Sequence, residues 1–423
     1  MKDSKMDSIA EDHSKFCGNC AEKPAFSFNA GTLLIISAVL LGSFLRVLNF
    51  VQDKSLWGDE FFTLWLFPMN YSQALSAILR DVHAPLYYFS LRFWMDIFGA
   101  SPLSLRAPSL IASILFMPVF IYFSGVVSGY DKKTMGMAAI FTSVSPYFLQ
   151  LSNEAREYSL AALLGVLVLL FFFRYLFERK APDGCLFGLF MLLGLYLHHY
   201  FWPLFFLLLI YFGWRTRAWA SVCKFAIPIF LLALPMLYCV VWQMRFSEGT
   251  FDISRIIPTF QPVSLAKTFF GQILQFGSGY YLSHISIQEL AGLIAHDLFG
   301  LLLILLVPLM ILASFLFVFV SADPGRREVR QTGILFLLLY IALTFVYPIR
   351  AKARYFAEFA PLFYLVVSSG LALGWQKKWS RILVLFFLAL NLGSSLYAVA
   401  IPTDPIHRED HRAITAFLSK NLN

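Results

Sequence analysis

Charged residues are scarce in this sequence. Asp, Glu, Lys and Arg make up 14% of its 423 residues, whereas 59% are hydrophobic, and the mean hydropathy is +0.70. A soluble domain contains about 25% charged residues, because charged side chains cover its water-facing surface. The shortage excludes a soluble enzyme, a disordered chain and a fibrous protein, and it leaves a membrane protein.

Alternation of polar and apolar residues is also missing. The apolar runs are continuous, whereas the strands of a transmembrane barrel alternate. A transmembrane helix needs about 20 largely apolar residues. We therefore predict an all-α, polytopic helical membrane protein with about eleven spans, of which those at 184–198 and 200–214 are short. The spans are expected at 31–50, 104–126, 135–152, 157–177, 184–198, 200–214, 222–243, 298–320, 332–348, 356–374 and 381–401.

Signatures of nucleic-acid binding and of a disulfide framework are absent. The net charge of +8 arises from cations scattered between apolar runs, without the basic stripe that binds nucleic acid. Such cations either set the topology or contact the phosphates of membrane lipids. Cys17 and Cys20 have the spacing of metal ligands, but no second pair follows, so the role of these two cysteines stays open.

A signal peptide is missing as well. Residues 1–30 are too long and too acidic for one and show no cleavage site, so we predict a cytoplasmic tail before a retained first span. Lys and Arg cluster in the turns that this orientation places in the cytoplasm. The membrane domain is predicted at 31–401, and an odd number of spans places a short tail, 402–423, on the outer side.

Two loops of roughly 50 residues, at about 51–103 and 244–296, are predicted on the outer side. The first contains an apolar stretch at 85–98 that is too short for a span. It carries Arg92 and Asp96, and each charge costs about 2.5–3.5 kcal/mol in the middle of a bilayer. We therefore predict an interfacial helix that begins at Pro85, where a missing N–H is tolerated.

Ionisable residues are nearly absent from the middle of the spans. A coupled transporter usually places acids or broken helices near the midplane, whereas an enzyme acting on a membrane-bound substrate needs its site at headgroup level. The distribution favours the enzyme. The candidate residues at the outer ends of the spans are Arg46, Asp59, Glu60, Asp81, His83, Arg106, Glu154, Arg156, Tyr158, His198, His199, Arg350 and Arg354.

Two polar pairs lie in the first outer loop. Asp59 and Glu60 are either a solvated pair at a helix N-terminus, where the helix dipole favours acids, or catalytic groups that include a general base. Asp81 and His83 either cap a helix, contact a phosphate, share a proton or bind a metal. A divalent metal held by His83 and Glu60 is an open alternative.

Two short outer turns are charged. Glu154 and Arg156 form either a structural ion pair or part of a polar site. Arg350 and Arg354 oppose the cytoplasmic bias of cations, which indicates an anionic partner, and the forked guanidinium suits phosphate. A headgroup contact without a catalytic part is the alternative.

Together these segments resemble the GT-C superfamily of glycosyltransferases that use polyprenyl-phosphate sugars. Within it, the chain looks most like the bacterial relatives of the protein O-mannosyltransferases (glycosyltransferase family 39) and the aminoarabinose lipid A transferases. The likeness runs in order from about residue 31 to 401 and rests on Leu45-Arg46, Ser55-Leu-Trp-Gly-Asp-Glu60, Asp81-Val-His-Ala-Pro-Leu-Tyr-Tyr88, Leu105-Arg-Ala-Pro-Ser109, Glu154-Ala-Arg-Glu-Tyr158, His199-Tyr-Phe201 and Arg354-Tyr-Phe356.

The resemblance implies a GT-C-like fold in a bacterial inner membrane with a periplasmic active site. It implies Asp59 as the catalytic aspartate, His83 near the donor phosphate, and Glu154 with Arg156 in a second polar turn. Many relatives have Asp where this chain has Tyr158.

The implied reaction is the inverting transfer of a sugar from a polyprenyl-phosphate donor to a hydroxyl group of a lipid, glycan or protein acceptor. Asp59 takes the proton, while Arg106, Arg156, Arg354 and His83, or a divalent metal, stabilise the leaving phosphate. The alternatives are a ligase or polymerase that uses lipid-linked oligosaccharides, and a transporter or flippase for lipid-linked sugars.

Overall fold

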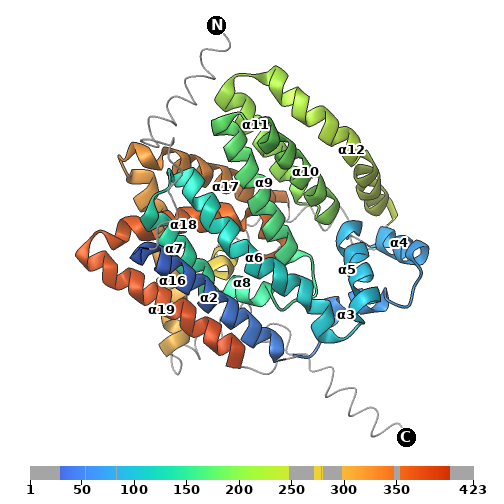
Figure 1. Cartoon of the computed structure of the whole chain (residues 1–423), viewed down its shortest axis with the longest axis horizontal. Coiled ribbons are helices and arrows are strands. Elements are labelled where there is room, and N and C mark those ends of the chain that lie inside the picture. Colours follow the sequence, from blue (N-terminus) through green and yellow to red (C-terminus); the bar gives the residue numbers. More distant parts are fainter. Residues whose placement is uncertain are drawn as a thin grey trace, which may run out of the picture.

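The computed structural model describes residues 29–52, 54–81, 83–246, 271–277, 279, 298–346 and 353–400. Within these ranges the chain forms helices and no strands (Figure 1). In chain order the elements are α2 (Ala30–Val51), α3 (Gly58–Trp65), α4 (Tyr71–Arg80), α5 (Pro85–Phe98), α6 (Pro102–Ser128), α7 (Lys132–Ser143), α8 (Pro146–Leu151), α9 (Tyr158–Glu178), α10 (Ala181–Leu197), α11 (Phe201–Thr216), α12 (Trp219–Phe246), α16 (Leu298–Val320), η2 (Pro324–Arg326), α17 (Arg327–Val346), η3 (Ala353–Phe359), α18 (Ala360–Trp375) and α19 (Lys378–Ala400).

The described helices confirm an all-α membrane protein with several spans. Seven of them are long and apolar enough to cross a membrane: α2, α6, α9, α12, α16, η3 with α18, and α19. The predicted number of spans, about eleven, is higher than these seven, and local features of the helices explain part of the difference. The run at 135–152 is two short helices, because Ser145 caps a new helix that begins at Pro146. As expected, α10 and α11 are short, with 17 and 16 residues.

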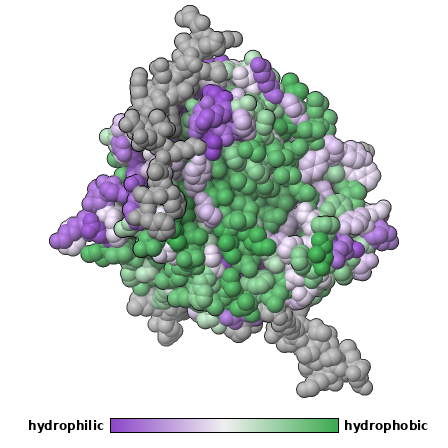
Figure 2. Space-filling view, viewed as in Figure 1, coloured by the Kyte–Doolittle hydropathy of each residue, from purple (hydrophilic) through white to green (hydrophobic). Residues whose placement is uncertain are grey.

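The core of the bundle lies around α6, α9 and α18, and α12 lies at its edge (Figure 1). The apolar window of η3 with α18 is 94% buried inside the protein, whereas that of α12 is 17% buried. Side chains on α12 such as Leu231, Leu232 and Tyr238 are exposed. A broad hydrophobic surface crosses the middle of the face shown in Figure 2, and hydrophilic residues gather toward its edges. Such a surface suits contact with lipid rather than with water.

The first long loop contains the helix that the sequence predicts. Helix α5 begins at Pro85 and ends at Phe98, and Pro85 occupies its first turn. Arg92 and Asp96 form an ion pair at i, i+4 spacing, with 3.2 Å between Nε and Oδ1. Helices α3, α4 and α5 lie together at one side of the bundle (Figure 1). The two predicted tails and most of the predicted loop at 244–296 lie outside the described residues.

Arg46 holds helices together rather than facing a site. Its guanidinium is fully buried on α2. It donates to the Gly42 carbonyl oxygen at 2.9 Å, to Ser113 Oγ on α6 at 2.8 Å and to the Thr142 carbonyl oxygen on α7 at 3.0 Å. These contacts explain why a buried charge is tolerated near the end of α2, and they correct the expectation that Arg46 belongs to the outer-face site.

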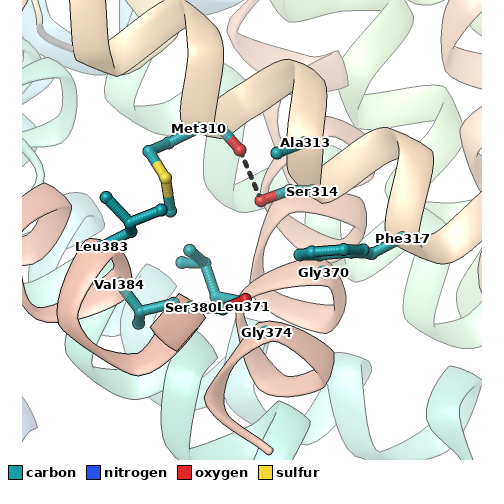
Figure 3. Close-up of a pocket in the computed structure, with 10 residues that line it drawn as sticks. All are labelled: Met310, Ala313, Ser314, Phe317, Gly370, Leu371, Gly374, Ser380, Leu383 and Val384. Carbon is teal, nitrogen blue, oxygen red and sulfur yellow. Dashed lines mark hydrogen bonds between the residues drawn. The ribbon is translucent and has the colours of Figure 1, made fainter. Parts of the chain in front are cut away.

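Small residues allow α16 and α18 to pack closely. A Cβ atom added to Gly370 on α18 would lie 2.4 Å from the Cα atom of Ser314 on α16. The small pocket beside this contact is lined by apolar side chains, glycines and two serines (Figure 3). The Ser314 hydroxyl donates to the Met310 carbonyl oxygen inside its own helix. Because no charged group lines it, the pocket is a packing feature of the bundle.

Gly370→Ala is expected to lower the melting temperature of the detergent-solubilised protein. The new methyl group meets backbone atoms, and overpacking costs about 1–3 kcal/mol. Gly374→Ala is the matched control, because a Cβ atom there lies 3.4 Å from the nearest side-chain atoms. Equal melting temperatures for the two variants would contradict the close contact.

Candidate functional site

Asp59 is the centre of a polar cluster built from three distant segments. It lies in the first turn of α3, and its side chain is 41% exposed. Its Oδ2 atom lies 3.3 Å from Nη1 of Arg156, which precedes α9, and 3.3 Å from Nη2 of Arg354 on η3. The two arginine side chains are only 5% and 1% exposed. A reachable carboxylate therefore faces two cations that the protein holds in place.

Glu60 points away from this cluster. It is fully buried, and Arg106 binds both of its oxygens, with Nε to Oε1 at 2.8 Å and Nη2 to Oε2 at 2.5 Å. The Ala155 backbone N–H also donates to Oε1 at 2.7 Å. Arg106 further donates to the carbonyl oxygens of Lys54 and Ser55. These contacts argue against the predicted catalytic role of Glu60 and the predicted phosphate contact of Arg106, and indicate a brace that holds α3 against the turn before α9.

Glu60→Gln is expected to destabilise the protein. Removing one charge of a buried ion pair leaves the other charge uncompensated and lowers the free energy of unfolding by about 3–5 kcal/mol. The amide oxygen of the new Gln side chain can still accept one of the hydrogen bonds. The neighbouring Asp59→Asn is the control, because Asp59 is partly exposed, and after its loss the buried Arg156 and Arg354 still have Glu157 and Glu154 beside them. Thermal unfolding in detergent measures both variants, and a smaller loss for Glu60→Gln than for Asp59→Asn would contradict the brace.

A chain of hydrogen bonds orients Arg156. Its Nη2 lies 2.7 Å from His83 Nε2, and His83 Nδ1 lies 3.0 Å from Asp81 Oδ2. Because a guanidinium only donates, His83 Nε2 accepts, and the ring proton lies on Nδ1 and is donated to Asp81. The His83 ring also stacks on Phe62 at 5.3 Å. Asp81 and His83 thus fix the direction of Arg156.

Glu157 anchors the other side of the same guanidinium. Its Oε2 lies 3.1 Å from Arg156 Nε, and both side chains are nearly buried. Burial is the largest single influence and raises the pKa of Glu157, but the neighbouring positive groups, Arg156 first among them, together outweigh burial and lower the pKa to about 2. The carboxylate therefore stays ionised, and Arg156 keeps this anchor, at any pH well above 2.

Aromatic rings surround Arg354. Its guanidinium carbon lies 4.6 Å from the ring centre of Trp57, 5.5 Å from that of Tyr158 and 5.6 Å from that of Tyr355. Its Nη1 atom lies 3.7 Å from Oε2 of the buried Glu154. The rings attract the cation and exclude water, so the predicted residues Glu154, Tyr158 and Arg354 do come together beside Asp59.

The predicted metal ligands do not fit a metal. Both nitrogens of His83 are engaged, with Asp81 and Arg156, and both oxygens of Glu60 bind Arg106. In the part of the chain that the structure describes, no group of three or more His, Cys, Asp and Glu side chains could hold a metal ion. Cys17, Cys20 and Arg350 lie outside the described residues.

Glu358 is a buried acid that the sequence reasoning missed. It lies on η3, its side chain is fully buried, and its Oε1 is 3.2 Å from His198 Nδ1. The signal was present, because an acid within an otherwise apolar segment is rare and usually paired. Of the two predicted histidines, His198 therefore faces η3, and His199 is half-buried in the same turn.

Comparisons with known proteins find similarity among solved structures. No protein-family model matches the sequence, and a search of curated proteins gives no match. A crystal structure of ArnT from Cupriavidus metallidurans in the apo state aligns with a TM-score of 0.49 and 13% identity over 80% of this chain and 59% of that chain. A second, of the same protein bound to undecaprenyl phosphate, aligns with a TM-score of 0.47 and 12% identity over 82% and 60%. The chain thus spans 59–60% of the length of these structures.

Proposed function

We propose that this membrane protein transfers a sugar from a polyprenyl-phosphate donor to a hydroxyl group, with inversion at the anomeric carbon. The observation that carries the proposal is the contact of the half-exposed Asp59 with two buried guanidiniums, those of Arg156 and Arg354, each at 3.3 Å. A group-transfer reaction of this kind needs a base for the acceptor and fixed positive charge for the leaving phosphate.

Each group has one role in the proposed step. The acceptor oxygen attacks the anomeric carbon while Asp59 takes its proton. The bond between that carbon and the phosphate oxygen breaks, and the phosphate leaves with its electron pair. Arg156 and Arg354 bind the developing charge through forked N–H donors, which match phosphate oxygens. A single displacement from the face opposite the leaving group inverts the anomeric centre.

The membrane setting supports a lipid-linked donor. The cluster lies where α3 and α9 begin and at the start of η3, where the apolar span formed by η3 and α18 begins. A polyprenyl chain fits against the exposed apolar side chains of such helices, while its phosphate remains at headgroup depth. A lipid, a glycan or a protein can supply the hydroxyl group.

The proposal is tested with the full chain purified into lipid nanodiscs. The probes are radiolabelled sugars on undecaprenyl phosphate and, separately, on undecaprenyl diphosphate, with lipid A, glycan and Ser/Thr-containing peptide acceptors. We expect transfer from a monophosphate donor, release of undecaprenyl phosphate, and a product of inverted configuration by NMR. Transfer from diphosphate donors alone would contradict the proposal and favour a ligase or polymerase.

A further inference from the structure

His198 and Glu358 form a buried contact behind the site. His198 ends α10 as its C-cap, and Glu358 belongs to η3. The two side chains are 11% and 0% exposed, with 3.2 Å between Nδ1 and Oε1. The contact joins the turn between α10 and α11 to the segment that carries Arg354.

Glu358 depends on this contact. Within the described ranges, its second oxygen, Oε2, has no hydrogen-bond partner. A buried carboxylate without compensation is costly, and removing one member of a buried ion pair leaves the other strongly unfavourable. Loss of the His198 charge therefore acts directly on the segment that contains Glu358.

The segment η3 has little freedom to absorb such a loss. A Cβ atom added to Gly165 on α9 would lie 2.5 Å from the Glu358 carbonyl oxygen, so the two backbones are already in close contact. Arg354 and Glu358 share the seven residues of η3, which has a kink at Phe356. The position of the Glu358 carboxylate and the direction of Arg354 are therefore coupled through a short piece of chain that is packed against α9.

We propose that His198 and Glu358 are positioning residues, which hold η3 so that Arg354 reaches Asp59 and the donor phosphate, and that they do so only while the imidazole of His198 is positively charged. This inference rests on the proposed function for its catalytic consequence. Its structural part, the ordering of η3 by a charged His198, is independent of any substrate.

The surroundings of His198 favour its charged form. The groups that face it are Glu358 on η3, Arg156 and Glu157 before α9, Tyr158 at the start of α9, and Tyr200 in its own turn. Burial lowers the pKa of His198, but the carboxylates of Glu358 and Glu157 outweigh burial, so the pKa is raised above 6.5. The stabilisation is thus complete below pH 6.5 and is lost as the pH rises through the raised pKa.

Hydrogen exchange of the full chain in nanodiscs tests the structural part. The readout is the protection of peptides covering 353–359 at pH 6 and at alkaline pH, corrected for intrinsic exchange. In the wild type, we expect protection to fall about tenfold on raising the pH, as for loss of a buried charged partner. His198→Gln should show low protection at both pH values. Exchange of η3 that is the same in both proteins at every pH would overturn the proposal.

Two variants separate positioning from general damage. His198→Gln combined with Glu358→Gln removes both charges, so η3 should be better protected than in His198→Gln alone and should show no pH dependence. Glu328→Gln breaks another buried pair, with Arg215 at 2.9 Å, and should leave the exchange of η3 unchanged. Failure of the double variant to restore protection would overturn the proposal.

The transfer assay tests the catalytic part. The wild-type transfer rate should fall at alkaline pH as His198 loses its positive charge, and the rate of His198→Gln should not show this decrease with pH. In an Arg354→Gln background, His198→Gln should cause no further loss, because both changes act through the same guanidinium. Additive losses would overturn the positioning role. Absence of any transfer by the wild type would overturn the proposed function, while the exchange measurements still decide whether His198 orders η3.

Discussion

Asp59→Asn is expected to lower sugar transfer by about 10²–10⁴-fold, the usual contribution of a general base. The amide has nearly the same shape as the carboxylate, so α3 and its contacts remain. It cannot take the acceptor proton, and it no longer balances the two guanidiniums at 3.3 Å. The measurement is the initial rate from a polyprenyl-phosphate sugar, normalised to monodisperse protein.

Asp96→Asn is the matched control for this change. Asp96 is 39% exposed and bonded to Arg92, much as Asp59 is 41% exposed and bonded to Arg156. It lies on α5, away from the cluster, so we expect near-normal transfer. Near-normal transfer by Asp59→Asn would remove Asp59 from the mechanism, whereas equal losses in both variants would indicate general damage to the loop.

Arg354→Gln is expected to lower transfer by about 10²–10³-fold, the cost of removing one fixed donor from a developing oxyanion. The loss should appear in kcat as well as in the KM for the donor, because the charge grows as the phosphate leaves. Arg354→Lys should restore part of the rate, since it keeps the charge but not the fork. Initial rates over a range of donor concentrations separate the two parameters.

Arg92→Gln is the control for Arg354→Gln. Arg92 also lies over aromatic rings, those of Phe67 and Tyr71, and also pairs with an aspartate. Its loss should leave kcat and the donor KM near the wild-type values. A folded Arg354→Gln variant with unchanged kcat and donor KM would show that the leaving phosphate does not depend on this guanidinium.

The ends of helices were predicted best where the sequence contains a local signal. Helix α5 begins as expected because Pro85 starts a helix without needing its missing N–H, and it is short rather than a span because Arg92 and Asp96 make a span costly. The expected span at 135–152 divides at Ser145 and Pro146 for an equally local reason. The prediction of one continuous span followed the apolar composition of this segment and overlooked the helix cap at Ser145.

Contacts between distant segments could not be predicted in the same way. Asp59 and Glu60 are adjacent in the sequence, but successive helical residues point about 100° apart, so one faces the cluster and the other faces Arg106. Arg46 and Arg354 are both cations at the ends of spans. Only tertiary packing separates the first, bound to helix carbonyl oxygens, from the second, which reaches Asp59.

The central claim is that Arg156 and Arg354 form the phosphate-binding half of a site whose other half is Asp59. A cryo-EM structure of the full chain with undecaprenyl phosphate tests it most directly. We predict phosphate oxygens within about 3 Å of both guanidiniums, the distance of a charge-assisted hydrogen bond. The Asp59 carboxylate should remain accessible to the hydroxyl group of an acceptor. A phosphate bound elsewhere, with both arginines still on Asp59, would contradict the account.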